Sequence, residues 1–150
     1  MNKEQLQNIR HLVVDCDGVL TDGKFWVDSD GNIMKGFNCL DVRAIREFLA
    51  NGWTVDIITA STWKGMVSFG RKTGANVIVL RDKSLYESKE PFIAIIDDAW
   101  DIPLMDKAVH VFFPYQSYLS QYTPANFSKW DLLTVTGGGG VIAELAKVLL

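Results

Sequence analysis

Short β-rich apolar runs alternate along the chain with segments of helical periodicity, and this alternation limits the fold more than any other feature of the sequence. The runs lie at 11–15, 53–59, 76–80, 92–96 and 108–113. The first is almost continuously apolar, as is typical of a strand covered on both faces. Strands that alternate with helices form a parallel sheet with helices packed on both of its faces. We therefore expect a three-layer, Rossmann-like α/β fold.

Helical periodicity is clearest in three segments. The predicted helices span 41–51, 62–73 and about 140 to the chain end. Asp41 can act as the N-cap of the first helix, and Gly74 can end the second. The last helix finishes in the apolar Val148–Leu150, which we expect to dock on its own domain or to cover a neighbouring subunit.

Residues 24–37 break this rhythm. Two extended stretches flank Asp28–Asn32, a cluster of turn residues, and this pattern predicts a small β-hairpin flap. No other segment is long enough to form a separate cap, so we expect residues 1–150 to form a single domain. An exposed aromatic on a hairpin is an interface anchor or a substrate platform, and for Phe25 and Trp26 we favour an interface.

Charge and hydropathy exclude several classes of partner. The 15 basic and 18 acidic side chains give a net charge of −3 without a basic cluster, which argues against a nucleic-acid duplex as the main partner. The longest apolar runs have four or five residues, far below the roughly 20 that cross a bilayer. The polar start, Met1–Gln5, and the two cysteines, Cys16 and Cys39, indicate a reducing cytoplasm. Since the charge argues against a nucleic-acid duplex as the main partner, we expect a small ligand.

Polar residues follow the apolar runs where each predicted strand ends, and these ends meet at the ligand-binding edge of an open α/β sheet. The candidates are Asp15 and Asp17, Thr59 and Ser61, Lys83, and Asp97, Asp98 and Asp101. The five carboxylates would repel one another unless a cation lay among them. Oxygen ligands of this type select Mg²⁺, which also accepts a substrate phosphate, so the five Asp residues predict a magnesium site.

The same set can carry out phosphoryl transfer. Thr59 and Lys83 can hold phosphoryl oxygens whose charge changes during the reaction. The Asp15 carboxylate can attack phosphorus and form an aspartyl-phosphate. Asp17 points to the same side of an extended backbone, so it can protonate the leaving oxygen and then activate water.

The segment Asp15-Cys16-Asp17-Gly18-Val19-Leu20-Thr21-Asp22-Gly23 resembles motif one of the haloacid dehalogenase (HAD) superfamily phosphatases. Thr59, Lys83 and the acidic stretch Asp97–Asp101 match the other motifs in the same order. Over about 10–147 the chain is similar to the capless phosphatases of 3-deoxy-D-manno-octulosonate 8-phosphate (KDO 8-phosphate).

This resemblance implies a Mg²⁺-dependent phosphomonoesterase with Asp15 as nucleophile and Asp17 as general acid and base. It also implies that Mg²⁺ is held by Asp15, the Asp17 backbone carbonyl and Asp97, with Asp101 acting through water and Asp98 nearby. It further implies a homotetramer whose hairpins pair, so that each neighbour helps to close the site.

Several positions depart from the pattern that the resemblance leads us to expect. Ala60-Ser61 stands where the family usually has Gly-Arg, which leaves Lys64 as the nearest cation, and Gly139 stands where the family often has Arg. Lys83 and Asp97 are only 14 positions apart, so we expect part of one helical layer to be reduced to a turn, with Lys89 as the reserve candidate for the lysine role.

Several alternatives stay open. The substrate is a sugar or sugar-acid phosphate, or else a nucleotide or nucleic-acid 3′-end phosphate, which the aromatic segment from Phe112 permits. A non-catalytic assembly or regulatory module is a third possibility. Trp100 can be an interface anchor or a substrate platform. The glycine run 137–140 can be a turn, or Gly138 and Gly139 can bind phosphate through their N–H groups at a helix N-terminus.

Overall fold

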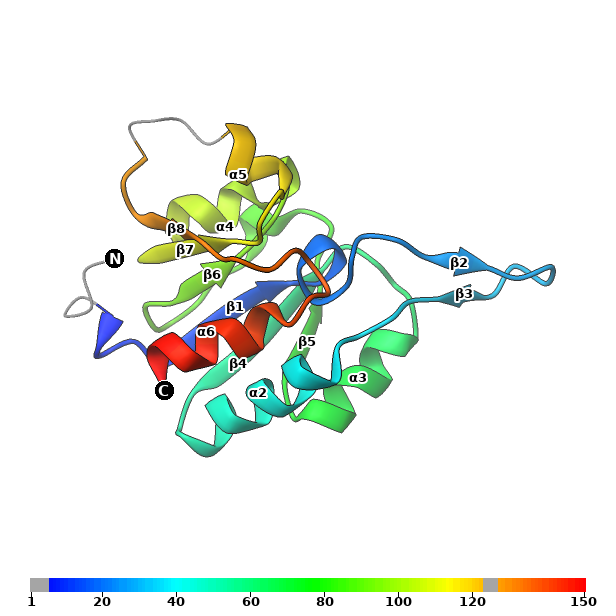
Figure 1. Ribbon diagram of the computed structural model, residues 1–150, viewed down its shortest axis with the longest axis horizontal. Coiled ribbons are helices and arrows are strands. Elements are labelled where there is room, and N and C mark those ends of the chain that lie inside the picture. The colour runs from blue at the N-terminus through cyan, green and yellow to red at the C-terminus, as the bar shows by residue number, and fades with distance from the viewer. Residues whose placement is uncertain (1–5, 123–126) are drawn as a thin grey trace.

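A parallel sheet forms the centre of the molecule, as the computed structural model shows (Figure 1). The structure describes residues 6–122 and 127–150, so the N-terminal residues 1–5 lie outside it. The strands are β1 (His11–Asp15), β4 (Thr54–Thr59), β5 (Asn76–Val79), β6 (Ile93–Ile95), β7 (His110–Phe113) and β8 (Trp130–Leu132). Their order is β5-β4-β1-β6-β7-β8 and every neighbouring pair is parallel, which confirms the α/β prediction.

Helices cover both faces of this sheet. One face carries α2 (Cys39–Ala50), α3 (Gly65–Thr73) and α6 (Val141–Leu149), and the other carries α4 (Ile102–Lys107) and α5 (Tyr118–Tyr122). Alternate residues of β1 supply the two cores: Leu12 and Val14 pack with the first set of helices, and Val13 packs with the second. The sequence did not predict β8, α4 or α5, because each is too short to show a clear periodicity.

The predicted hairpin is present and projects from the body of the molecule (Figure 1). Its strands, β2 (Trp26–Val27) and β3 (Ile33–Met34), pair antiparallel. The turn is held by Asp28, whose Oδ1 accepts hydrogen bonds from Asp30 N at 2.9 Å and Asn32 N at 2.8 Å. The apolar side chains of both strands are exposed.

The connection between β5 and β6 lacks an α-helix, and all of its residues lie in the described part of the chain. A single 3₁₀ turn, Lys83–Leu85, takes the place of a helix, as the short spacing predicted. Lys107 of α4 holds this connection, because its Nζ donates to Ser84 O at 2.6 Å and Tyr86 O at 2.7 Å. These bonds keep Lys83 at the carboxyl edge of the sheet.

Asp41 has a different role from the one that we predicted. The N-cap of α2 is Asn38, whose Oδ1 accepts from Leu40 N at 2.9 Å. Asp41 is buried and instead caps α6, because its Oδ1 accepts from Ile142 N at 2.8 Å and Ala143 N at 3.0 Å. Burial raises the pKa of Asp41 to about 6, although these backbone bonds partly oppose the rise. The cap joins two helices that are distant in the sequence.

An Asp41→Ala variant should therefore lower the free energy of unfolding by about 1–2 kcal/mol, the usual cost of a lost N-cap. Asp41→Asn is the matched control, because its amide oxygen can still accept both N–H groups, and it should cost less. Urea unfolding of the three proteins measures the difference. Equal midpoints for Asp41→Ala and the wild type would show that the cap contributes nothing to stability.

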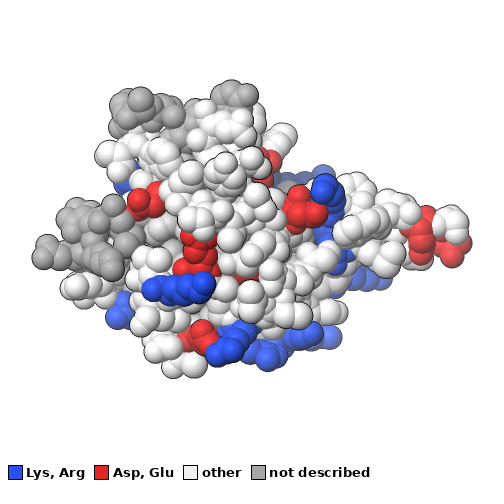
Figure 2. Space-filling model, viewed as in Figure 1, with Lys and Arg blue, Asp and Glu red and all other residues white. Residues whose placement is uncertain are grey.

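Surface charge is mixed on the face shown in Figure 2. Lys and Arg gather along the edge formed by α2 and α3, acidic residues lie among and above them, and the hairpin tip is acidic. In the described part of the chain, every helix is too short or too polar to cross a membrane.

Candidate active site

Asp15 and Lys83 form the centre of the site. Asp15 is the buried last residue of β1, and Lys83 Nζ lies 2.5 Å from its Oδ1. The same ammonium donates to Asp101 Oδ1. Burial disfavours the charge on Lys83, but the two carboxylates outweigh burial and raise the pKa of Lys83 above its usual range. The structure thus places Lys83 at this position, whereas Lys89 is exposed and does not line the pocket.

Three carboxylates meet beside this lysine. Asp15, Asp97 and Asp101 each place one oxygen within 4.8 Å of the other two. Burial and then repulsion from Asp101 raise the pKa of Asp15 to about 7; burial and then repulsion from Asp15 raise the pKa of Asp97 to about 9. The buried Asp97 Oδ1 has no hydrogen-bond partner in the described part of the chain. Because one lysine cannot balance three anions, the cluster fits a divalent metal ion bound through oxygen.

The other two predicted metal ligands lie outside this cluster. The Asp17 carboxylate binds Lys35, whose Nζ is 2.7 Å from both oxygens. Asp98 Oδ1 accepts a hydrogen bond from Trp100 N at 2.8 Å. Both Asp17 and Asp98 still line the pocket. The predicted set of five metal-binding carboxylates therefore narrows to three, because the side chains of Asp17 and Asp98 are bound elsewhere.

Lys35 is a site residue that the sequence did not reveal. It follows β3, yet its side chain is only 7% exposed and reaches Asp17 across the base of the hairpin. Its Nζ lies 5.7 Å from the ring centroid of Trp63, and Trp63 Nε1 donates to Ile33 O at 3.0 Å. Through Lys35 and Ile33, these contacts connect the hairpin to Asp17 and Trp63 beside the pocket.

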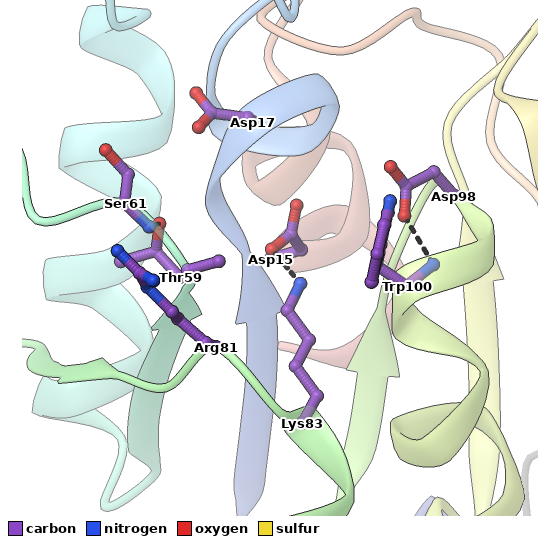
Figure 3. Close-up of a pocket in the computed structure, with 9 residues that line it drawn as sticks. Asp15, Asp17, Thr59, Ser61, Arg81, Lys83, Asp98 and Trp100 are labelled. Carbon is purple, nitrogen blue, oxygen red and sulfur yellow. Dashed lines mark hydrogen bonds and ion pairs between the residues drawn. The ribbon is translucent and has the colours of Figure 1, made fainter.

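A cavity of about 130 Å³ opens beside Asp15 and Lys83 (Figure 3). Its lining consists of Asp15, Asp17, Thr59, Ala60, Ser61, Arg81, Lys83, Asp98 and Trp100. Thr59 is buried at the end of β4, the strand next to β1, and its Oγ1 accepts a hydrogen bond from Ser61 N at 3.1 Å. The structure thus brings the predicted catalytic residues and two predicted phosphate-binding hydroxyls to one cavity.

The turn after β1 requires glycine at position 18. Gly18 has a φ of +89°, and a Cβ there would lie 1.9 Å from Asp97 Oδ2. A side chain would therefore both strain the backbone and displace Asp97. Glycine at this position lets the loop after β1 approach the carboxylate cluster.

The chain is similar over almost its whole length to curated phosphatases. It is 29% identical to the 3-deoxy-D-manno-octulosonate 8-phosphate phosphatase KdsC of Salmonella typhi and 28% identical to that of Escherichia coli K12. Each alignment covers 96% of this chain and 80% of the relative. No family model matches the chain.

Solved structures share the fold. A hypothetical protein of Xanthomonas campestris has a TM-score of 0.87 at 25% identity over 98% of this chain and 84% of that one. A HAD superfamily (subfamily III A) hydrolase of Legionella pneumophila has a TM-score of 0.83 at 27% identity, with coverages of 98% and 85%. The KDO 8-phosphate phosphatase of Moraxella catarrhalis, in complex with magnesium, phosphate and KDO, has a TM-score of 0.84 at 22% identity, with coverages of 100% and 91%. The chain is a HAD-type phosphatase that is homologous to KdsC over almost its whole length.

The glycine run of this KdsC-like phosphatase does not form the anion site that we considered. Gly138 N donates to Val19 O and Gly139 N donates to Thr136 O, both at 2.9 Å. Neither glycine lines the cavity beside Asp15, and Asp41 already caps the N-terminus of α6. The prediction that Gly138 and Gly139 bind phosphate is therefore wrong. Their N–H groups already donate to backbone carbonyls and are not available to a phosphate.

Two further residues line the HAD-type site, Arg81 and Trp100. Arg81 is separated from the end of β5 by Leu80 alone and directly follows the predicted strand 76–80, and this position alone could have identified it. Trp100 lies in the acidic stretch and is 77% exposed. Lys64, which we expected to be the nearest cation, is exposed and does not line the cavity. The cation beside Ser61 is Arg81 (Figure 3).

Proposed function

We propose that this HAD-type phosphatase hydrolyses a small sugar phosphate or sugar-acid phosphate, with Asp15 as nucleophile and Mg²⁺ as cofactor. The observation that carries the proposal is the burial of the Asp15 carboxylate between Lys83 and the two carboxylates of Asp97 and Asp101. The KdsC relatives are named as phosphatases of KDO 8-phosphate, and this supports the substrate class.

In the first step, an Asp15 oxygen attacks phosphorus and the bond to the leaving oxygen breaks. Lys83 and Thr59 hold phosphoryl oxygens, and Asp17, which must first take up a proton in place of one of its two bonds to Lys35, gives that proton to the leaving oxygen. In the second step, Asp17 takes a proton from water, which attacks the aspartyl-phosphate, and phosphate leaves as Asp15 is restored. Lys35 orients Asp17, because it binds both carboxylate oxygens.

Asp15, Asp97 and Asp101 are the side chains that would hold the metal ion, together with the Asp17 backbone carbonyl. When bound there, Mg²⁺ would neutralise the carboxylates and withdraw charge from the phosphoryl oxygens. The unpartnered Asp97 Oδ1 and the raised pKa values of Asp15 and Asp97 support this assignment. Asp98 and Ser61 remain candidates for contacts at the pocket wall.

The test is phosphate release from sugar-acid, sugar, nucleotide and 3′-phosphorylated oligonucleotide substrates, with Mg²⁺ and with a chelator. We expect Mg²⁺-dependent release that is concentrated on sugar or sugar-acid phosphates. Preference for nucleotides or 3′ ends would replace the substrate class but keep the chemistry. If the folded, Mg²⁺-supplied protein released no phosphate from any of them, a non-catalytic module would be the better interpretation.

Residues 1–150 are expected to act as one domain within a homotetramer in the cytoplasm. The exposed apolar residues of the hairpin, Trp26, Val27, Ile33 and Met34, support pairing between copies. Such pairing would place a neighbouring chain near each pocket. The C-terminal helix α6 is a second candidate contact. Assembly and location both stay predictions.

A further inference from the structure

Arg81 and Trp100 line the active-site pocket but have no part in the proposed mechanism. Figure 3 shows them on opposite sides of Asp15 and Lys83, with Arg81 beside Ser61 and Trp100 beside Asp98. Arg81 and Trp100 are exposed, whereas Asp15 and Lys83 are buried. The two residues therefore lie toward the mouth of the pocket, where the leaving group of a substrate must extend.

Arg81 offers an unused positive charge at this mouth. The bond from Leu80 N to Thr59 O, 2.8 Å long, fixes the backbone before Arg81 at the edge of the sheet. Within residues 6–122 and 127–150, the Arg81 guanidinium has no hydrogen bond or ion pair. The adjacent Asp82 instead accepts from Ser84 N at 3.0 Å. A free guanidinium can bind a carboxylate or phosphate through two parallel hydrogen bonds.

The transferred phosphoryl group already has its own partners. Lys83 and Thr59 are buried at the base of the pocket, and the acidic cluster supplies the metal site there. Arg81 is exposed and lies farther out, on the Ser61 side. An anion carried by another part of the substrate fits this position better than the phosphoryl group itself.

Trp100 forms the facing wall. Its backbone is fixed, because Trp100 N donates to Asp98 Oδ1 and Asp98 N donates to Asp101 Oδ2 at 3.3 Å. Its side chain nevertheless remains 77% exposed, more than any other large hydrophobic residue in the described part of the chain. An uncovered aromatic ring on a fixed backbone is suited to pack against the carbon chain of a ligand.

We propose that Arg81 and Trp100 select the leaving group: Arg81 binds a second anionic group, carboxylate or phosphate, and Trp100 packs against the carbon chain between the two anions. This inference rests on the proposed function, since it concerns the substrate of that reaction. It assigns the selection of the substrate to two residues outside the catalytic set.

Three substrates with the same carbon chain test the role of Arg81. Sorbitol 6-phosphate has no second anion, 6-phosphogluconate adds a carboxylate, and sorbitol 1,6-bisphosphate adds a phosphate. We expect Arg81→Gln to lower kcat/KM for an anionic substrate by about 10- to 100-fold, the value of a charge-assisted hydrogen bond. Activity on sorbitol 6-phosphate should change by less than about threefold, and Arg81→Lys should restore part of the loss.

The matched control is Lys64→Gln, which removes one positive charge near the site from a residue that does not line the pocket. It should leave the ratio between substrates unchanged. Trp100→Ala should raise KM for all three substrates by about fivefold and leave the oligomeric mass unchanged. The anionic substrate that loses more in Arg81→Gln identifies carboxylate or phosphate as the preferred second anion.

Three results would overturn the inference. An equal loss on all three substrates would mean that Arg81 holds the transferred phosphoryl group, and no loss would mean that it binds nothing. A change of mass in Trp100→Ala without a change in KM would make Trp100 a subunit contact. These results differ from failure of the proposed function, in which the wild type with Mg²⁺ hydrolyses neither these substrates nor p-nitrophenyl phosphate.

Discussion

Replacing Asp15 by Asn is expected to reduce phosphatase turnover by about 10⁴-fold or more, the scale seen when a covalent nucleophile is removed. An amide cannot form the aspartyl-phosphate, yet its oxygen can still accept the hydrogen bond from Lys83. The variant should therefore remain folded. Phosphate release measures the loss, and circular dichroism checks the fold.

Asp106→Asn is the matched control, because Asp106 is exposed on α4 and does not line the pocket. It should retain wild-type turnover. Full activity in folded Asp15→Asn would exclude Asp15 as the nucleophile, and the acidic cluster would then need another role.

The same pair of proteins gives a pH test in the presence of a chelator. The pKa of Asp15 is raised from 3.8 to about 7 by burial and by Asp101. Between those values the folded state binds more protons than the unfolded state, so this group lowers stability as pH rises. Asp15→Asn lacks the effect. The variant should thus gain in melting temperature relative to the wild type as the pH rises from about 4 to about 7.

Replacing Lys83 by Met should affect both activity and stability. The loss of the ammonium removes a phosphoryl-binding group, for which we expect a fall in kcat of about 10²- to 10³-fold. It also leaves the buried Asp15 and Asp101 carboxylates without their cation. Breaking a buried pair in this way costs about 3 kcal/mol at neutral pH, and protonation of the carboxylates should reduce the cost in acid.

Lys89→Met is the control, since it removes an exposed lysine from the same connection between β5 and β6. Turnover and urea unfolding should match the wild type. The opposite pattern, with an inactive Lys89→Met and an active Lys83→Met, would show that Lys89 fills the lysine role and that the ammonium beside Asp15 is not required for turnover.

Much of the fold could be predicted because the signals are local. The apolar run before Asp15 and the turn residues around Asp28 each specify their own structure through a few neighbouring residues. The short spacing between Lys83 and Asp97 likewise predicted the missing helix. In contrast, β8 and α5 have three and five residues, which is too few for a period to stand out.

The errors about individual residues have a different cause. Asp41 was expected to cap its own helix, but it binds the N-terminus of α6, 101 residues further along the chain. Lys35 was overlooked because only the fold of the hairpin brings it to Asp17. Gly138 was considered as a phosphate ligand because its contact with Val19 is invisible in the sequence.

By itself, the sequence determined the α/β class and the set of acidic residues at the strand ends, because periodicity and strand boundaries depend on near neighbours. The parallel sheet then guarantees that those strand ends share one edge. Only the tertiary structure decided which members of the set meet. Asp15, Asp97 and Asp101 cluster around Lys83, while Asp17 turns to Lys35, because side-chain direction at a loop depends on contacts between segments far apart in the chain.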